Sequence, residues 1–532
     1  MERDLGQTSS TSAQRWVLAL TAVASLMVML DTMVVTTALS TIRVHLGASI
    51  EELEWTVNAY TLSFAVLLMT AAALGDRFGR RRLFVTGIGL FTAASVACAL
   101  APGIGWLIAA RAVQGAGSAM TMPHALALLS AAFPPQRRAG ALGLFSSVTG
   151  LATLGGPMVG GAVTQGLAWQ WIFWLNVPIG LLVIPLILNR IEENRGTDIS
   201  LDFRGLALVT GGALGLVWGL VRGNAAGWGS PEVVGSLAAG AVLAAAFVAW
   251  ELRAREPMLP MRFFRSAAFS SGNAASFLLF GSIFGAAFFF AQFLQTTLHY
   301  GPLGAGLRLA PWTVTLFVVA PIAGALVNRV GERPFIVGGM LLQAAGFAWI
   351  ALIARPGLPY PAMIPPLVLA GSGVSMAMPA AQNSVIGSVP RAAIGKASGA
   401  FNTLRQLGGT FGIAILAAVF AGSGGYASAQ AFSNGFAPAI GVAAGLSLVA
   451  AVAGLWTLTP DRWRMIPTSA NGQPAVGAYL RRDDGAHRAH SVQVFTFADS
   501  GLARIVAFVD PHLFATFGLP LTYSPAAAAP RR

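Results

Sequence analysis

Residues 73–84 read ALGDRFGRRRLF, and residues 325–336 read ALVNRVGERPFI. Each stretch follows a long apolar run and keeps the order Ala-Leu, Asp or Asn, Arg, Gly and Arg. The two stretches lie about 250 residues apart, as does a second pair of matching segments. The second pair consists of Arg138, Gly143 and Phe145, and of Arg391, Gly399 and Phe401. The chain therefore contains two copies of one unit, arranged in the same orientation.

The composition indicates that this unit lies in a membrane. Of 532 residues, 55% are hydrophobic and 10% are charged, whereas soluble domains carry roughly 25% charged residues. The single cysteine, Cys98, lies in an apolar run and predicts a buried thiol. The net charge of +13 suggests nucleic acid binding in a soluble chain, but arginines also orient membrane helices.

Fourteen apolar stretches are long enough to cross a bilayer core of ~30 Å, which takes about 20 residues each. The first runs from Trp16 without a signal-peptide cleavage pattern, and we expect it to be retained. The expected spans are 16–39, 55–75, 83–101, 105–129, 140–163, 171–188, 205–222, 233–250, 271–294, 303–327, 334–354, 361–382, 397–421 and 435–457.

The basic residues fix the direction of these spans. With the N-terminus inside, the inner segments before the C-terminal tail hold nineteen Lys and Arg residues, and the outer loops hold three, Arg43, Arg222 and Arg355. Positive charge gathers on the cytoplasmic side of membrane proteins. We therefore expect a multi-pass protein of the cytoplasmic (inner) membrane with both termini cytoplasmic, and no nucleic acid partner.

The repeat and the spans together predict four parts. These are an N-terminal six-helix bundle (1–190), an inserted pair of helices (191–265), a C-terminal six-helix bundle (266–460) and a cytoplasmic tail (461–532). The fold class is thus an all-α polytopic membrane protein with a small α+β tail. Parallel halves are a plan of membrane transporters, whose substrate site lies near the midplane between the halves. Duplicated receptors and membrane enzymes share this plan, so the side chains must decide.

The loop from Asp76 to Arg82 resembles the signature loop after the second helix of the major facilitator superfamily, with Ala72 where a glycine is usual. Further segments resemble the fourteen-helix drug:proton antiporter branch of that family, and the resemblance covers about residues 14–460. These segments are Leu30-Asp31-Thr32, Arg111-x-x-Gln114-Gly115-x-Gly117, Gly156-Pro157-x-x-Gly160-Gly161, Trp171 to Gly180, and Arg405-Gln406-Leu-Gly408-Gly409. The family associates the Gly156 to Gly161 pattern with exporters.

Asp31 is the only acidic residue well inside an expected span. A charged carboxylate at such depth costs about 2.5–3.5 kcal/mol on insertion scales, so it must be neutral, paired or hydrated. Arg111 is the expected counter-ion at similar depth, and such a pair suits proton coupling. The resemblance also implicates this arginine in coupling. The alternatives are a structural carboxylate and an arginine that caps backbone carbonyls.

Two motifs are expected to control conformation. In the fifth span, the glycines allow close helix contact and the proline bends the helix, which predicts a deformable contact between the halves. In the loop after the second span, Asp76 can accept bonds from arginine and act as a latch on the cytoplasmic side. Ordinary packing and charge-based topology are the alternative explanations. The residues are Asp76, Arg77, Gly79, Arg80, Gly156, Pro157, Gly160 and Gly161.

Aromatic and amide side chains inside the spans are the candidates for substrate binding. In the ninth span, phenylalanines recur every three or four residues on one face, as a cavity wall requires. Packing or lipid contact is the alternative role. The candidates are Trp55, Asn58, Gln114, Asn176, Phe280, Phe284, Phe288, Gln292, Asn383 and Asn402.

After Pro460 the chain becomes polar. The segments 491–497 and 503–508 alternate like two strands joined near Asp499-Ser500-Gly501, which predicts a hairpin. The stretch 471–520 resembles the end of the polyketide-cyclase-like (SnoaL-like) domain of some sigma factors. Because only part of such a domain would be present, we expect a loosely folded or docked appendage.

The sequence therefore predicts a proton-driven exporter of small amphiphilic organic compounds such as drugs or antibiotics, working by alternating access. The chain has no G-x-x-x-x-G-K-[ST] loop, so we expect protons rather than ATP to drive it. We expect no cofactor, metal or catalysis; the partners are a small-molecule substrate, protons and the lipid bilayer, and the protein is a monomer. The alternatives are a narrow natural-product exporter, an uptake symporter and a non-transporting membrane sensor.

Overall fold

The computed structural model describes residues 2–195, 202–255, 257–389, 394–455, 463–481, 486–498 and 501–523. Helices lie at all fourteen expected positions, and a small β-sheet follows them. Among the described residues, twelve helical segments are long and apolar enough to cross a bilayer. The other two expected positions hold α4 (Ile104–Ala132), which carries Arg111, Gln114 and His124, and α5 (Pro135–Gly166), which is rich in glycine. The expected fold class, all-α and polytopic, is confirmed.

The first group of helices lies within residues 2–195. α1 packs against α4 and α5, α2 packs against α4, and α3 packs against α4 and α7. The bounds not yet given are α1 (Glu2–Leu46), α2 (Ile50–Phe78), α3 (Arg80–Ala99), α6 (Trp171–Trp174) and α7 (Asn176–Arg190).

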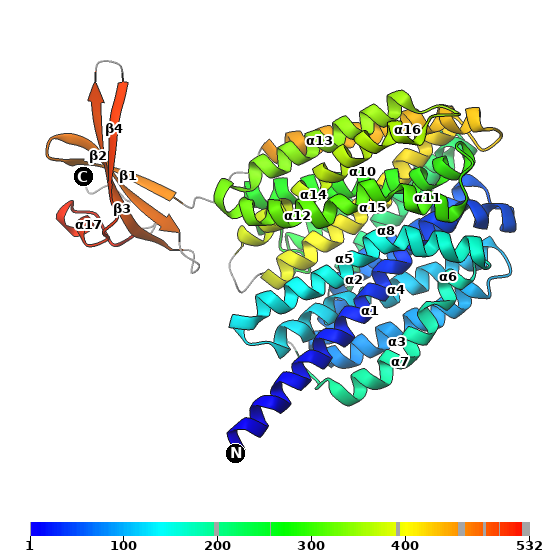
Figure 1. Ribbon diagram of the computed structural model, residues 1–532, viewed down its shortest axis with the longest axis horizontal. Helices are drawn as coiled ribbons and strands as arrows, with labels where there is room; N and C mark the ends of the chain where they lie inside the picture. Colours follow the sequence, from blue (N-terminus) through cyan, green and yellow to red (C-terminus); the bar gives the residue numbers. More distant parts are fainter. Residues whose placement is uncertain are drawn as a thin grey trace.

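A second group repeats this arrangement after the inserted helices α8 (Phe203–Ala226) and α9 (Pro231–Glu251). α10 packs against α15 and α16, and α14 packs against α12 and α13. Figure 1 shows the two groups side by side. The bounds are α10 (Ala267–Thr296), α11 (Pro302–Arg308), α12 (Ala310–Val330), α13 (Glu332–Ile353), α14 (Ile364–Gly387), α15 (Ile394–Ser423) and α16 (Ala429–Leu455), with 3-10 turns η1 (Met261–Arg265) and η2 (Tyr360–Met363).

The two copies of the repeated loop have the same backbone form. α2 passes into α3 at Gly79, which has φ of 116°, and α12 passes into α13 at Gly331, which has φ of 97°. L-residues with a side chain rarely adopt such positive φ values, so both loops need glycine at this place. The match supports the repeat seen in the sequence, while the division at residues 190, 265 and 460 remains a prediction.

Two expected spans are interrupted rather than continuous. The sixth divides into α6 and α7 at Leu175, and the tenth divides into α11 and α12 at Leu309. Pro178 and Pro311 stand just after these points. A proline has no N–H to donate to the carbonyl four residues earlier, which weakens the helix there.

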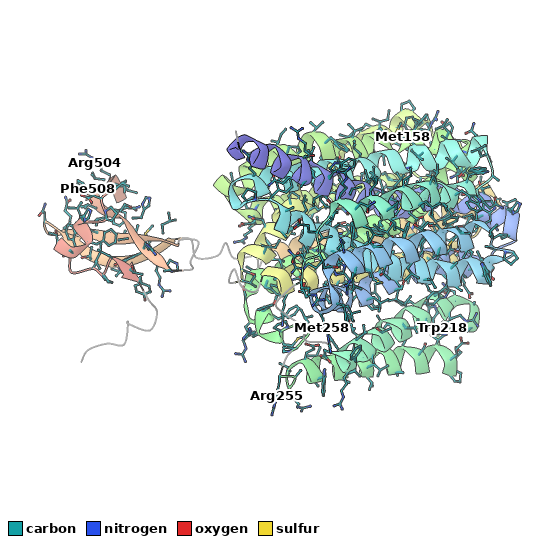
Figure 2. All side chains as sticks on the ribbon, turned by 90° about the horizontal axis from the view of Figure 1, so that it is seen from below. Met158, Trp218, Arg255, Met258, Arg504 and Phe508 are labelled. Atoms are coloured by element: carbon teal, nitrogen blue, oxygen red, sulfur yellow. The ribbon has the colours of Figure 1, made fainter. Side chains whose placement is uncertain are left out.

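The inserted helices α8 and α9 pack on each other at the edge of the helical body, beside α2 and α15. Figure 2 shows Trp218 of α8 at the end away from the β-sheet, and Arg255 and Met258 at the end nearer to it. This placement agrees with a chain that crosses the body twice in this hairpin.

The tail is a five-stranded antiparallel sheet in the order β1-β2-β3-β4, with β5 paired to β3. The predicted hairpin is confirmed as β3 (His487–Ala498) and β4 (Gly501–Phe508), but the expectation of only two strands is wrong. β1 (Trp463–Ala470) and β2 (Gln473–Arg481) turn at Asn471-Gly472, whose positive φ values of 51° and 75° fit a tight hairpin turn. A short helix, α17 (Leu513–Thr516), and β5 (Thr522–Tyr523) complete the tail.

The sheet has a small core of its own. Tyr479 of β2 and Phe514 of α17 are both fully buried, and their rings meet edge to face at 5.0 Å between centroids. Burial raises the pKa of the Tyr479 hydroxyl to about 12. The tail is thus more ordered than the sequence suggested, and its resemblance to a cyclase-like domain remains a prediction.

Candidate functional site

The first functional feature is a charged pair inside the first group of helices. Arg111 of α4 donates from Nη1 to Oδ2 of Asp31 on α1 at 2.5 Å, and the two side chains are each 1% exposed. The sequence analysis expected Arg111 to be the counter-ion of Asp31, and the two side chains are in contact in the structure. Because a buried pair that loses one partner leaves an uncompensated charge, both members must be held firmly.

Amide side chains complete the environment of the carboxylate. Gln114 donates to Oδ1 of Asp31 at 2.9 Å, and Asn176 of α7 donates to the same oxygen at 3.0 Å. Both amides also donate to the hydroxyl of Ser95 on α3, at 2.9 and 3.3 Å. The sequence analysis named Gln114 and Asn176 as candidates for substrate binding; the structure places both around Asp31, and a role in substrate binding stays a prediction.

The guanidinium of Arg111 has further partners. It donates from Nη1 to Oε1 of Gln114 at 2.7 Å and from Nε to the carbonyl of Thr56 on α2 at 3.2 Å. Its Cζ lies 4.2 Å from the ring centroid of Tyr60, whose hydroxyl bonds Ser118 at 2.8 Å. The network therefore joins α1, α2, α3, α4 and α7, and a change of protonation at Asp31 would be felt by all five helices.

The sequence missed Ser95 and Thr56 in this network. Ser95 is one of three hydroxyl side chains in a mostly apolar helix, and Thr56 acts through its backbone carbonyl, so no side-chain pattern marks either role. The sequence also missed Glu54, which is buried at 2% exposure near the N-terminal end of α2. The expected second span began one residue later, so Glu54 was counted as a loop residue.

The Gly156 to Gly161 pattern of α5 lies where this helix meets two other helices. A Cβ placed on Gly156 would strike Met33, and one placed on Gly160 would lie 2.7 Å from the carbonyl oxygen of Val34, both on α1. A Cβ on Gly161 would lie 2.7 Å from Cα of Leu303 on α11, in the other group of helices. The glycines therefore allow backbone contact both within one group and between the two.

The loop after α2 is held by ionic and backbone contacts. Arg80 donates from Nε to Asp76 at 2.7 Å, and both side chains are about a quarter exposed. The segment after α7 joins this loop, because the N–H of Arg81 donates to Glu193 at 2.9 Å and that of Arg80 donates to the carbonyl of Asn194 at 2.8 Å.

Other members of this loop have simple surroundings. Arg77 is exposed and stacks its guanidinium 5.4 Å from the ring of its neighbour Phe78. Gly79 faces the Glu193 carboxyl group, which would lie 2.6 Å from an added Cβ. The acidic pair Glu192-Glu193, which stands between Arg190 and Arg195, is a sequence signal that could have predicted this contact.

The aromatic candidates divide between two places. Phe280 and Phe284 of α10 lie 6.0 Å apart between ring centroids, beside Arg405 of α15. Phe288 is fully buried in the apolar core against Phe289. The expected stripe along α10 is therefore not one continuous wall.

Trp55 lies beside the inserted helix α8. Its ring is 5.7 Å from that of Trp218 on α8, at the side of the protein. Both tryptophans line a groove of about 810 Å³ between α2, α4, α8 and α9, whose charged lining residues are Glu51, Glu52, Arg222 and Glu232. This cavity is mostly apolar, and it does not lie between the two bundles where the sequence reading expected the substrate.

The polar candidates also differ in their surroundings. Gln292 donates to the carbonyl of Phe288 at 2.6 Å and accepts from Tyr426. Asn402 donates to the Ser398 carbonyl at 2.9 Å, and Asn383 donates to Glu332 at 2.6 Å. Asn58 is fully buried, and neither of its amide atoms has a partner among the described residues. Gln292, Asn402 and Asn383 thus have intramolecular partners, while Asn58 alone keeps both polar atoms free.

A helical membrane body built of two similar halves, with a buried acid-base pair in one of them, defines a polytopic membrane transporter. The family model of the Major Facilitator Superfamily matches residues 21–413 and again 272–527. The chain belongs to this superfamily.

Relatives of known name share much of the chain. It is 35% identical over 403 residues to the tetracenomycin C resistance and export protein of Streptomyces glaucescens, covering 75% of this chain and 74% of the relative. It is 35% identical over 399 residues to the multidrug resistance protein Stp of Mycobacterium tuberculosis, covering 74% of each. It is 34% identical to the cephamycin export protein CmcT of Amycolatopsis lactamdurans, covering 88% of this chain and 96% of the relative.

Solved structures show the same fold at low identity. A POT family transporter in complex with a thioalcohol conjugated peptide aligns with a TM-score of 0.63 at 15% identity, covering 82% of this chain and 95% of that one. A bacterial homologue of the human lysosomal transporter Spinster aligns with a TM-score of 0.61 at 17% identity, covering 84% and 97%.

Proposed function

We propose that the protein exports small amphiphilic organic compounds, such as drugs or antibiotics, across the cytoplasmic membrane in exchange for protons. The observation that carries this proposal is the Asp31–Arg111 pair with its amide partners, because a titratable group joined to five helices can couple proton binding to their arrangement. The names of the relatives support export of such compounds.

The coupling step follows from the donors around Asp31. The carboxylate accepts from Arg111, Gln114 and Asn176, an arrangement suited to its charged form. A proton on Oδ2 would take the place of the Arg111 donor. The guanidinium would keep the Thr56 carbonyl and the Gln114 oxygen as acceptors, so proton binding would loosen α1 from α4 without leaving Arg111 bare.

Alternating access requires the two halves to separate on one side at a time. In this structure they touch near the ends expected outside: Gln295 of α10 donates to the Thr37 carbonyl of α1 at 3.0 Å, and the N–H of Leu303 donates to Gln165 of α5 at 3.2 Å. Opening to the outside would break these contacts and part α5 from α11. Glycine-lined contacts can separate without moving interlocked side chains.

The same proposal includes the orientation of the protein in the membrane, its oligomeric state and its lack of catalysis. Its termini lie in the cytoplasm, it works as a monomer, and it carries out no catalytic reaction. The four-part division of the chain, with α8 and α9 as an insert and the tail as an appendage, belongs to this proposal as well.

Two other functions within transport are the alternatives. A narrow natural-product exporter is favoured by the names of several relatives, and an uptake symporter would use the same coupling pair in the opposite direction. A non-transporting sensor would have no need of a buried charged pair, because burial of two charges is costly.

The test uses inverted membrane vesicles, in which export appears as uptake. The native protein should accumulate a fluorescent amphiphile when a proton gradient is applied and lose it when a protonophore is added. Asp31→Asn should abolish gradient-driven uptake, whereas Glu192→Gln, which removes an exposed carboxylate after α7, should not. Full accumulation by Asp31→Asn would contradict the coupling role, and accumulation only in right-side-out vesicles would indicate an uptake symporter.

A further inference from the structure

A second intramembrane cation lies in the other half of the protein. Arg405 stands on α15 (Ile394–Ser423), ~16 Å from the start of the helix at ~1.5 Å per residue. In a hydrocarbon core of ~30 Å this is near the midplane. An ionisable residue at such depth is expected to serve a function and to have a partner of opposite charge.

Arg405 has no such partner among the described residues. No ion pair and no hydrogen bond joins it to any of them, and its buried Nε lacks an acceptor. The contrast with Arg111 is direct, since Arg111 has the Asp31 carboxylate, the Gln114 oxygen and the Thr56 carbonyl as acceptors. The charge of Arg111 is therefore neutralised by Asp31, whereas no carboxylate of a described residue neutralises the charge of Arg405.

The free guanidinium lies against an aromatic side chain. Its Cζ lies 4.9 Å from the ring centroid of Phe280, and the Phe284 ring follows at 6.0 Å from that of Phe280. One turn after Arg405, Gly409 leaves room for Phe284, which lies 3.1 Å from where a Cβ would stand. Contact with a ring face orients the planar guanidinium and leaves its N–H groups available at the edge.

We propose that Arg405 binds the anionic group of the exported compound, a carboxylate or an ionised phenol, while Phe280 and Phe284 contact its aromatic rings. A guanidinium matches a carboxylate with two parallel hydrogen bonds, and this match is strong where water is scarce. The proposal rests on the proposed export function and adds to it a substrate class, aromatic acids. It also gives two of the predicted α10 phenylalanines a common role.

Other anions could meet the same chemistry. No carboxylate of a described residue supplies the partner in this structure, because Asp31 is paired with Arg111 and none of the others pairs with Arg405. The phosphate of an anionic phospholipid has the same chemistry as a bound acid. The experiment must therefore separate a dissolved acid from a lipid headgroup.

The test measures binding, without a proton gradient, to the purified full-length protein in phosphatidylcholine nanodiscs. The probes are 2-naphthoate and methyl 2-naphthoate, which share the rings and differ in charge, with empty nanodiscs subtracted. The native protein should bind the acid at least about tenfold more tightly than the ester, which corresponds to ~1.4 kcal/mol. Arg405→Gln should remove this preference and leave ester binding unchanged, and Arg405→Lys should keep part of it.

The control is Arg355→Gln, which removes an exposed arginine and should leave both affinities unchanged. Equal binding of acid and ester by the native protein, or an unchanged preference in Arg405→Gln, would overturn the proposal. So would loss of the preference when phosphatidylglycerol is added to the nanodiscs, since the site would then belong to lipid phosphate. Should Arg405→Gln fail to fold, Arg405→Lys and the lipid comparison decide the matter.

This experiment is independent of proton coupling. Asp31→Asn should still prefer the acid over the ester even if it no longer transports. A protein that binds the acid through Arg405 but shows no gradient-driven export would refute the export proposal and retain the anion site. Gradient-driven export by a protein that shows no preference for the acid would refute the anion site and retain the export proposal.

Discussion

Gly306 of α11 lies directly against the carbonyl group of Pro157 on α5, so that a Cβ on this glycine would collide with the carbonyl oxygen. The contact joins the two groups of helices by backbone alone. Pro157 belongs to the motif that the family resemblance associates with export, and its partner lies in the opposite half. The motif thus takes part in an interface that alternating access would have to open.

Gly161→Leu should slow turnover while substrate binding stays close to native. The added side chain would meet Cα of Leu303 and hold α5 away from α11, so the two groups of helices could not close at this contact. A fall in turnover of about tenfold or more, roughly 1.4 kcal/mol in the barrier, is expected. Vesicle transport rates and equilibrium binding measure the two quantities separately.

Gly155→Leu is the matched control, because nothing lies within 4 Å of a Cβ at that position on the same helix. It should transport like the native protein. If Gly161→Leu lost substrate binding but turned over its residual complex normally, Gly161 would line the substrate site instead.

Asp31→Asn should destabilise the protein more than the double change Asp31→Asn/Arg111→Gln. The single change leaves a buried guanidinium without its counter-ion, which costs about 3–5 kcal/mol in soluble proteins. The double change removes both charges. Thermal unfolding in nanodiscs should show a lower midpoint for the single variant, whereas a lower midpoint for the double variant would mean that the pair is not a neutralised unit.

The helical body could be predicted from the sequence because its determinants are local and repeated. Span length, the distribution of arginines and the two copies of the loop around Asp76 each depend only on order along the chain. The Asp31–Arg111 pair could be predicted for the same reason, since two lone charges at similar depth in apolar helices have few other partners.

The surroundings of these residues could not be predicted in the same way. Gln114 and Asn176 face Asp31 because α4 and α7 both pack against α1 and α3. The rotation of each helix about its axis, which decides this, cannot be derived from hydropathy. The position of Trp55 depends on the inserted helix α8, whose packing on α2 has no sequence pattern. The turn residues Asn471-Gly472 could have predicted the first hairpin of the tail, which the sequence analysis did not include.

Gly79→Ala should lower stability more than Gly227→Ala. Both glycines have positive φ, 116° and 88°, so both substitutions strain the backbone, by about 1 kcal/mol or more. At Gly79 the added Cβ would also lie 2.6 Å from the Glu193 carboxyl group, whereas nothing lies within 4 Å at Gly227. The difference between the two unfolding midpoints therefore reports the contact between the loop and Glu193.

If the two variants have equal midpoints, the contact with Glu193 adds nothing to the stability of the loop. A third variant, Gly79→Ala/Glu193→Ala, should recover part of the stability lost in Gly79→Ala, because the shorter side chain at residue 193 makes room for the added Cβ. Surface ion pairs contribute only ~0–1 kcal/mol, so this recovery should come from relief of crowding.

Deleting residues 461–532 should leave export nearly unchanged. The cut falls before β1 (Trp463–Ala470), so it removes the whole sheet together with its Tyr479–Phe514 core and leaves no unpaired strand behind. α1 to α16, the Asp31 network, the loop at Asp76 and the α5 glycines all precede the cut. Transport per molecule in inverted vesicles, with membrane abundance matched, is the quantity to compare.

A shorter deletion from residue 482, which removes β3 to β5 but keeps β1 and β2, is the informative contrast. It leaves a two-strand remnant that is marginally stable alone, and it should lower the abundance of the protein rather than its transport rate. An abundance-corrected loss greater than about tenfold in the full deletion, ~1.4 kcal/mol in the barrier, would show that the sheet acts on the transport cycle.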